Sequence, residues 1–577
     1  MACAALIFLA CIFSPPNLMD DVDAVQPQIA RHMLESGDWV TPRLDGVAYL
    51  EKPPLKYWMM AVSFLVFGVH DWAARLPVAL AAVLLCWVVA RFGAWAFGGA
   101  AGLYAGLALA TCVGLFLFTR VLISDVILTL AISLSLWSLA RALDEEEAHP
   151  AAWAMLLWAS MAVGLLLKGL IAFVLPVGSG LLYLAASGQW RSRETWRRLR
   201  VLPGLLLLSA IAAPWHLLAM LRNPPYLDFT MHAEPRSYRG FFWFYFINEH
   251  VLRYLNLRYP RDYNTVPRLY FWVFHLLWLF PWSVYLPALF RTDYRGRERA
   301  SRVRLLALCW TGWVLGFFTF STTQEYYSMP CYPALALMIG AALARGGRIV
   351  RIATRVAAGI AGIALVSVAI ILWLVRGLPA PGDIASALSQ HPEVYTLSLG
   401  HMTDLTLAAF AYLRLPLALA GVAFLIGAAG AWRFRDWRAT ISLAVMMTVF
   451  FHAARLAMVV FDPYLSSRAL AEGLLRSPAG QLIVDDPYYE FSSVFFYSNR
   501  SALLLNGRVN NLEYGSYAPG APRVFIDDAA FARLWLSGER HYVVTEAPKI
   551  SRLEQLVGKR ELHVVVASGG KLLFSNQ

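Results

Sequence analysis

Charged residues are scarce in this chain of 577 residues: they make up 15%, and 59% of the residues are hydrophobic. A soluble domain carries about 25% charged residues, so the composition excludes a soluble protein and indicates a polytopic membrane protein. Lysine is scarcer still, with six among the 49 basic residues. The arginines gather in short tracts between apolar runs, without interleaved aromatic residues in a polar module. The net charge of +12 therefore does not indicate nucleic-acid binding.

Motifs of other classes are missing as well. The six cysteines are scattered through apolar stretches with no CxxC or metal-ligand spacing, and we expect them to pack as small hydrophobic side chains. No internal repeat or low-complexity segment is found, so the sequence does not support an inverted-repeat transporter.

The apolar runs predict about thirteen transmembrane helices, because a span needs about 20 apolar residues. Four arginine-rich tracts fall on one side of the membrane only if the N-terminus is cytoplasmic and the C-terminus is outside. Residues 53–68 would reverse this order if they spanned, so we interpret them as a helix at the membrane interface, which suits Lys56, Tyr57 and Trp58. The predicted spans are 2–17, 75–95, 100–118, 126–141, 151–167, 169–186, 201–221, 267–289, 305–321, 326–344, 356–375, 406–431 and 439–460.

The chain changes character after residue 460. Short apolar runs such as "QLIVDD", "ALLLNG", "RVFIDD" and "HYVVTE" read as strands, and "AAFARLWLSG" and "ISRLEQLVGK" read as short helices. We therefore predict a transmembrane domain over 1–460, whose first extracytoplasmic loop is 18–74, and a small extracytoplasmic α/β domain over 461–577.

Ionisable residues converge on the predicted outer face. Loop charges there can simply be solvated, Lys168 before Gly169 can simply end a helix, and Glu249 can simply pair with Arg253 four residues on. The lysines fit those readings less well, because every lysine of the membrane region lies at this face and lysine suits phosphate. The pattern favours attack on a sugar whose leaving group is an anionic lipid phosphate. The residues concerned are Asp20, Asp21, Asp23, Glu51, Lys52, Arg120, Asp125, Lys168, Glu249, His250, Arg253 and Arg258.

One long stretch carries a family likeness. "IARHMLESGDWVTPRLDGVAYLEKPPLKYW" resembles the first extracytoplasmic loop of bacterial C-type membrane glycosyltransferases, namely the aminoarabinose transferases of lipid A and the related protein-O-mannosyltransferase-like enzymes. "VLISDVILTL", "LLKGLIAFVLP", "INEHVLRY" and "YYSMPCYPALAL" match further segments in the same order, so the likeness covers roughly residues 18–340. The resemblance implies a polytopic C-type fold and transfer of a sugar, with inversion and outside the cytoplasm, from a polyprenyl-monophosphate donor.

The resemblance also assigns residues. Glu51 and Lys52 match the family's Glu-Lys before proline, Asp125 its second-loop aspartate, and Lys168 its Lys-Gly pair. Glu51 and His250 correspond to a pair that can hold a divalent metal in the aminoarabinose enzymes. The pattern Asp-Glu-x-Arg-Tyr, however, would align with residues 22–26, where the Arg-Tyr pair is lost. Neither aminoarabinose nor lipid A follows from the sequence for that reason.

These residues suggest a mechanism. We expect Lys52, Lys168 and Arg253 to bind the donor phosphate. An aspartate of the Asp21/Asp23 pair would be the base for the acceptor hydroxyl. We expect Asp125 to support the site or to face the acceptor. No cofactor is required, since two ligands alone make a weak metal site at Glu51 and His250.

The expected partners are a polyprenyl-phosphate-linked sugar and a lipid, glycan or protein acceptor at the bacterial inner membrane, and not nucleic acid. The alternative is a transporter or flippase of lipid-linked sugars. Alternating access would call for ionisable residues in mid-span. A non-catalytic assembly protein would leave the lysines and aspartates of the outer face without a role.

Overall fold

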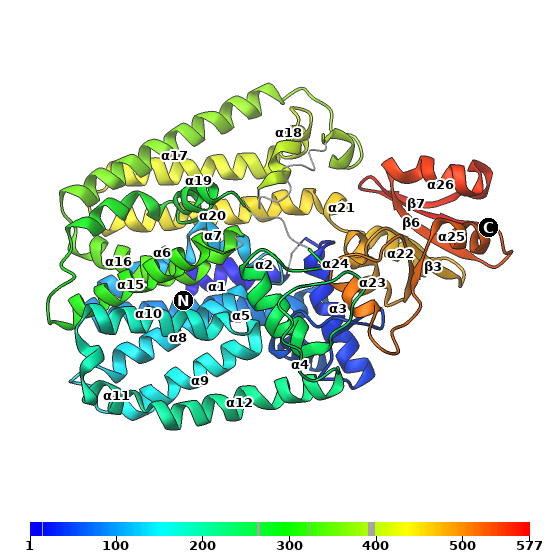
Figure 1. The fold of residues 1–577 in the computed structure, drawn as a ribbon. Helices are drawn as coiled ribbons and strands as arrows, with labels where there is room; N and C mark the ends of the chain where they lie inside the picture. Colours follow the sequence, from blue (N-terminus) through cyan, green and yellow to red (C-terminus); the bar gives the residue numbers. More distant parts are fainter. Residues whose placement is uncertain (14–15, 262–265, 322–323, 390–398) are drawn as a thin grey trace.

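Long apolar runs form a bundle of roughly parallel helices with an α/β unit at one end (Figure 1). The computed structural model describes residues 1–13, 16–261, 266–321, 324–389 and 399–577. Within these residues eight helical segments are long and apolar enough to cross a membrane, or nine if one bent pair counts as a span. These segments contain α5 (Asp71–Phe97), α8 (Asp125–Ala142), α9 (Pro150–Lys168), α12 (Val201–Arg222), α16 (Tyr332–Arg345), α17 (Arg348–Leu374), α19 (Arg414–Arg433) and α20 (Trp437–Val460).

The remaining predicted spans are helical too, but they are short, interrupted or less apolar. The predicted span 100–118 is broken between α6 and α7, and the predicted span 267–289 is the bent pair, in which α14 and η3 meet at 100°. The total of thirteen spans therefore stays a prediction. The elements are α1 (Ala2–Phe8), α2 (Ala10–Phe13), α6 (Gly99–Ala110), α7 (Val113–Phe118), α10 (Ile171–Ala186), α14 (Arg268–Trp278), η3 (Trp282–Arg291), α15 (Arg299–Thr319) and α18 (Ala409–Tyr412).

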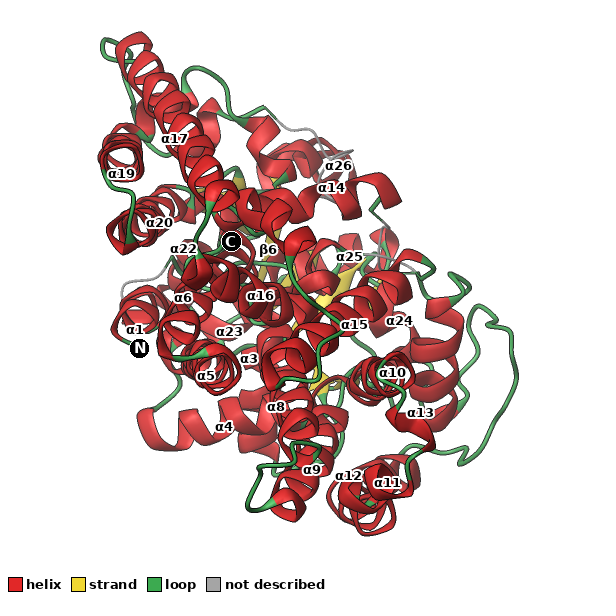
Figure 2. Cartoon of the chain, turned by 90° about the vertical axis from the view of Figure 1, so that its left-hand side faces the viewer, coloured by secondary structure: helices red, strands yellow, loops and turns green. Residues whose placement is uncertain are grey.

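The arginine-rich tracts share the end of the bundle that lies away from the α/β unit (Figure 1). There Arg299 pairs with Asp144 at 2.8 Å, and Arg198 of α11 (Arg193–Leu199) donates to the carbonyl oxygen of Asp144. Figure 2 views the molecule from this side, with α17, α19 and α20 grouped at one edge and α12 at the other. The prediction that these tracts fall on one side of the membrane agrees with this arrangement.

The α/β unit contains one six-stranded sheet in the order β5-β4-β3-β6-β8-β7. Its first four strands run parallel, and β8 pairs antiparallel with both β6 and β7. Each predicted strand and both predicted helices are confirmed. The elements are β3 (Gln481–Asp485), α23 (Ser492–Ser498), β4 (Ala502–Leu505), α24 (Asn510–Ser516), β5 (Phe525–Ile526), α25 (Asp528–Trp535), β6 (His541–Glu546), α26 (Ile550–Val557), β7 (His563–Ser568) and β8 (Lys571–Ser575), preceded by α21 (Asp462–Leu465) and α22 (Arg468–Arg476).

Asp20 anchors this unit to the bundle. Its carboxylate accepts hydrogen bonds from the backbone and the hydroxyl of Ser493, at 2.8 and 2.7 Å, and from the hydroxyl of Ser467 at 2.5 Å. The Lys571 ammonium adds an ion pair at 2.6 Å. Asp20 directly precedes the segment that leads into α3 (Val22–Ser36), so the first loop and the α/β unit are held together where the bundle ends.

The first loop continues through a short hairpin to an apolar helix. Strands β1 (Arg43–Leu44) and β2 (Val47–Ala48) pair antiparallel, and α4 (Leu55–Phe67) follows. At 13 residues α4 is too short to span a bilayer. Val62, Leu65 and Val66 are exposed on it, but Lys56 is 4% exposed and points inward, which corrects the expectation that this lysine sits at the membrane interface.

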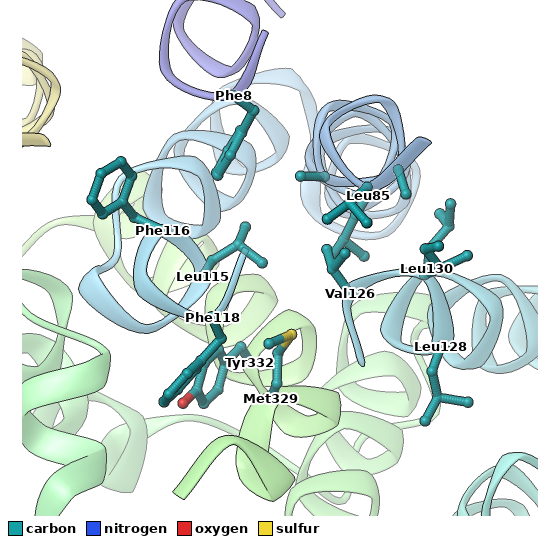
Figure 3. Packing of buried hydrophobic residues seen from close by; sticks show 14 of the residues in the cluster. Phe8, Leu85, Leu115, Phe116, Phe118, Val126, Leu128, Leu130, Met329 and Tyr332 are labelled. Atoms are coloured by element: carbon teal, nitrogen blue, oxygen red, sulfur yellow. The ribbon is translucent and has the colours of Figure 1, made fainter. Parts of the chain in front are cut away.

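A core of buried apolar side chains joins α7, α8 and α16 (Figure 3). Val126, Met329 and Tyr332 are fully buried, and the ring of Phe118 meets Trp278 edge-on at 5.2 Å. Closely packed side chains hold one another in place, because there is no free volume into which they could move. The core therefore fixes the start of α8 relative to η4 (Glu325–Cys331), the segment that leads into α16.

Candidate functional site

Most of the candidate residues meet at the end of the bundle that carries the α/β unit. They come from the loop before α4, the start of α8, the end of α9, the π-helical segment η2 (Trp243–Leu252) and η4. π-Helical turns are rare and occur frequently at functional sites. Each of these elements ends or bends at this level of the bundle, which brings polar side chains from separate parts of the sequence together.

Lys168 and Asp125 form one half of the site. Helix α9 ends at Lys168 because Gly169 adopts φ +80°, and α8 begins with Asp125. The Lys168 Nζ lies 2.5 Å from Asp125 Oδ1 and 5.4 and 5.0 Å from the ring centroids of Tyr326 and Tyr327. Lys168 thus ends a helix and also places a cation among two aromatic rings and a carboxylate.

Arg253 connects this half to the first loop. Its Nη2 donates to the Tyr327 hydroxyl at 3.1 Å, and its Nη1 lies 3.3 Å from Glu51 and 2.9 Å from Glu249. Lys52 also pairs with Glu51. A continuous series of contacts therefore runs from Asp125 through Lys168, Tyr327, Arg253 and Glu51 to Lys52. It contains Lys52, Lys168 and Arg253, whose role in binding phosphate stays a prediction.

The α/β unit contributes a side chain directly. Asn511 of α24 donates from Nδ2 to Glu51 Oε2 at 2.6 Å, and its Oδ1 accepts from Arg258. Arg258 is buried and also pairs with Glu249, while the Tyr49 hydroxyl donates to Glu51 at 2.7 Å. Sequence reasoning missed Asn511, since it lies 460 residues from Glu51 in a segment for which no helix was predicted.

Cations outnumber carboxylates in this cluster. Burial alone would raise the pKa of Glu51, but the charges of Lys52, Arg258 and Arg253 hold it well below its usual range, so Glu51 is ionised. Within the part of the chain that the structure describes, four cations and three carboxylates meet in this cluster, a composition that favours an anionic ligand. Its cations are Lys52, Lys168, Arg253 and Arg258, and its carboxylates are Glu51, Asp125 and Glu249.

The two aspartates expected to supply a base differ in their surroundings. Asp23 is 1% exposed, and its oxygens accept from the backbone of Met19 and Leu122 and from Arg75 at 3.1, 2.9 and 3.1 Å. Asp21 is exposed, with φ +63°. Desolvation by the surrounding chain and the neighbouring charges of Asp20 and Asp23 raise its pKa to about 6. Asp21 is therefore the accessible member of the pair.

Glu51 and His250 do not fit a divalent metal. The His250 Nε2 accepts the backbone N–H of Leu170 at 3.1 Å, so its Nδ1 carries the hydrogen that is donated to the Tyr245 carbonyl at 2.5 Å. Burial lowers the pKa of His250 to about 4, which keeps the ring neutral. With both nitrogens used, and both Glu51 oxygens already paired, neither residue offers a free lone pair. Among the described residues no group of three potential ligands occurs either.

Comparisons with known proteins find relatives of one kind. The family model described as dolichyl-phosphate-mannose-protein mannosyltransferase matches residues 51–217. The undecaprenyl phosphate-alpha-4-amino-4-deoxy-L-arabinose arabinosyl transferase of Edwardsiella ictaluri is 25% identical over 89% of this chain and 86% of its own length. The Pseudomonas aeruginosa protein of the same name is 33% identical over 55% of this chain and 54% of its own length.

A solved structure matches the whole chain. The crystal structure of ArnT from Cupriavidus metallidurans bound to undecaprenyl phosphate superposes with a TM-score of 0.79 and 22% identity, over 100% of this chain and 97% of that one. The likeness confirms the predicted fold, a helical membrane protein with a small C-terminal α/β unit. Together these matches confirm the resemblance that the first-loop motif carries.

Proposed function

We propose, on the premise that this chain is a relative of the bacterial C-type membrane glycosyltransferases, that it transfers a sugar from a polyprenyl-monophosphate donor to a lipid, glycan or protein acceptor, with inversion. One observation carries the proposal: Lys52, Lys168 and Arg253, from three distant parts of the chain, lie in one connected cluster. Such a cluster stabilises the charge that develops on a departing lipid phosphate.

The chemistry follows from the charges. The acceptor oxygen attacks the anomeric carbon, the bond from that carbon to the phosphate oxygen breaks, and the acceptor hydroxyl loses its proton. The phosphate changes from a singly charged diester to a doubly charged monoester, which the Lys52, Lys168 and Arg253 side chains stabilise. Asp21 takes the proton, because it is the accessible carboxylate, while Asp23 positions the loop around Leu122.

Asp125 has a supporting role in this proposal. Its carboxylate pairs with Lys168 and thereby aims the ammonium toward the site. The positions of the arginine tracts support an orientation in which the α/β unit is periplasmic and the N-terminus is cytoplasmic, in the bacterial inner membrane.

The relatives' names supply a candidate donor, undecaprenyl phosphate-4-amino-4-deoxy-L-arabinose. The aminoarabinose transferases that the first loop resembles supply lipid A as a candidate acceptor. This chain lacks the Arg-Tyr pair of that group at Val25 and Gln26, so the proposal names the donor class and leaves the sugar to experiment.

The test is mass spectrometry of lipid-linked sugars and envelope glycans from cells with and without the gene. We expect the deletion strain to accumulate one polyprenyl-phosphate sugar and to lose that sugar from one glycan. An Arg253→Gln variant should reproduce the deletion. A donor trapped on the cytoplasmic leaflet would indicate the alternative, a flippase, and unchanged glycans would contradict transfer.

A further inference from the structure

Lys56 is a buried lysine that the proposed reaction does not yet use. It lies four residues after Lys52, in the first turn of α4, and is 4% exposed. Its Nζ donates to Gln26 Oε1 at 2.6 Å and to the carbonyl oxygen of Leu122 at 3.3 Å, and the Tyr57 ring centroid is 5.2 Å away. No ion pair involves Lys56 in the part of the chain that the structure describes. A buried ammonium without a carboxylate partner is costly, so this position calls for an explanation.

The acceptors around Lys56 suit a group that changes charge. A neutral amine has two hydrogens, which Gln26 and Leu122 can accept, and an ammonium has three. Burial, followed by the charge of Lys52, lowers the pKa of Lys56 to about 7. Both forms are therefore accessible near neutrality.

The charges that act on Lys56 belong to the candidate site. Lys52 and Lys168 oppose its protonation, and Asp125 and Glu51 favour it. The other elements packed against its Nζ present the Gln26 amide from α3, the Leu122 carbonyl before α8 and the Tyr57 ring of α4. Electrostatic coupling is reciprocal, so an anion bound among Lys52, Lys168 and Arg253 raises the affinity of Lys56 for a proton.

Lys56 also fixes the backbone segment that precedes Asp125. Both backbone groups of Leu122 are hydrogen-bonded: its N–H donates to Asp23 at 2.9 Å, and its carbonyl oxygen accepts from Lys56. Asp125 follows three residues later, and its carboxylate forms an ion pair with Lys168. A change in the charge of Lys56 therefore affects the phosphate-binding residues in two ways. It changes the electrostatic potential at the site, and it acts through the backbone that leads from Leu122 to Asp125.

We propose that Lys56 is a positioning residue that takes up a proton when the donor's lipid phosphate occupies the site, adding a further cation near Lys52, Lys168 and Arg253. This inference rests on the proposed function and deepens it. The proton comes from solvent on binding. When the sugar leaves, the phosphate gains a second negative charge, and the Lys56 ammonium compensates part of it without touching the phosphate.

The expected size of the effect follows from linkage. A single charge about 10 Å away, at an effective dielectric constant of about 20, changes a proton-binding constant about ten-fold. Phosphate binding then favours the ammonium, and protonation in turn favours phosphate binding. Affinity must therefore rise as the pH falls through about 7. For this coupling it rises about four-fold between pH 8.5 and pH 7.0.

The experiment uses the full-length protein in detergent micelles and the probe methyl farnesyl phosphate, a diester that keeps one negative charge across this pH range. Native mass spectrometry measures its dissociation constant at pH 8.5 and 7.0. Wild type should bind about four times more tightly at pH 7.0. This window lies above the pKa of about 6 of Asp21, whose own titration therefore contributes little.

Two variants separate charge from structure. Lys56→Met has no group to protonate and lacks the contact with Leu122, so the ratio of its affinities at the two pH values should lose the four-fold gain. Gln26→Glu places a carboxylate 2.6 Å from Nζ and keeps the lysine protonated throughout, so the pH dependence should vanish although the contact remains. The control is Glu490→Gln, which removes another group with a pKa of about 7 and should leave the gain intact.

The outcomes are distinct. Wild type that binds equally at both pH values, or a Lys56→Met variant that retains the gain, overturns the role of Lys56 while leaving the donor class standing. Weaker binding of both variants at pH 8.5 also overturns it and assigns Lys56 a purely structural role. Wild type that binds the diester at neither pH overturns the proposed function itself, and the inference with it.

Discussion

Asn511 offers the sharpest test of whether the α/β unit takes part in the proposed transfer. The Asn511→Ala variant removes a 2.6 Å hydrogen bond to the ionised Glu51 and the contact with Arg258. Hydrogen bonds to charged groups are worth about 1.5–3 kcal/mol each. Glu51 keeps Tyr49, Lys52 and Arg253, and Arg258 keeps Glu249, so we place the combined loss below the sum of the two bonds, at about 2 kcal/mol. If Glu51 must be held to orient Lys52 and Arg253, kcat/KM falls about 30-fold.

The assay is transfer of the native sugar in deletion-strain membranes that contain equal amounts of each variant, quantified by mass spectrometry. A matched control lies in the same helix: Glu513 accepts from the Tyr259 hydroxyl at 2.8 Å and does not contact Glu51. Glu513→Gln should keep the wild-type rate within about two-fold. Asn511→Asp should be at least as damaging as Asn511→Ala, because it places a second carboxylate against Glu51.

The fold should survive the Asn511 change, because the α/β unit stays docked through Asp20, Ser493 and Lys571. A lower rate with an unchanged thermal midpoint would therefore report positioning rather than unfolding. Transfer at the wild-type rate by Asn511→Ala would refute the reasoning, since it would mean that Glu51 needs no partner from the α/β unit.

Further predictions concern the base, the phosphate cations and the metal. Asp21→Asn should leave donor binding intact and slow turnover by about 10²–10⁴-fold, and wild-type turnover should rise as the pH increases through about 6, where Asp21 loses its proton. Asp23→Asn should instead lower stability by about 3 kcal/mol, measured as a lower thermal midpoint, because it leaves the buried Arg75 without its carboxylate. Lys168→Met should weaken binding of methyl farnesyl phosphate about ten-fold, whereas Lys559→Met, in the α/β unit away from the cluster, should not change it. Chelation with EDTA should leave transfer unchanged; loss of activity that Zn²⁺ restores would contradict the pairing of His250 with Leu170.

Hydrophobic periodicity and composition were sufficient to predict many of the helices and strands of this protein. The absence of charge over long runs predicts helices in a bilayer, and the short β-branched runs of the tail predict the strands that form its sheet. These elements follow from local patterns, because burial of an apolar face dictates a 3.6-residue or 2-residue repeat. Lys52, Lys168 and Arg253 were also predicted together, from residue type and the family resemblance.

The breaks in the helices were not predictable in the same way. The apolar run 267–289 reads as one continuous span, yet the chain bends by 100° between α14 and η3. Composition measures only how much of a segment is apolar. The direction of a helix is set by the neighbours against which it packs, such as the Phe118 ring on Trp278.

The sequence by itself determined the class of the molecule and the strands of the α/β unit, and it predicted the residues that suit a lipid phosphate, because each depends on the chemistry of a short stretch. Only the tertiary structure decided which members of that set act together. It separated the exposed Asp21 from the buried Asp23, used both nitrogens of His250, and turned Lys56 toward Gln26. It also brought Asn511 onto Glu51 across 460 residues. The accessibility of a side chain and the partners of its lone pairs depend on which distant segments come into contact, and the local sequence does not determine those contacts.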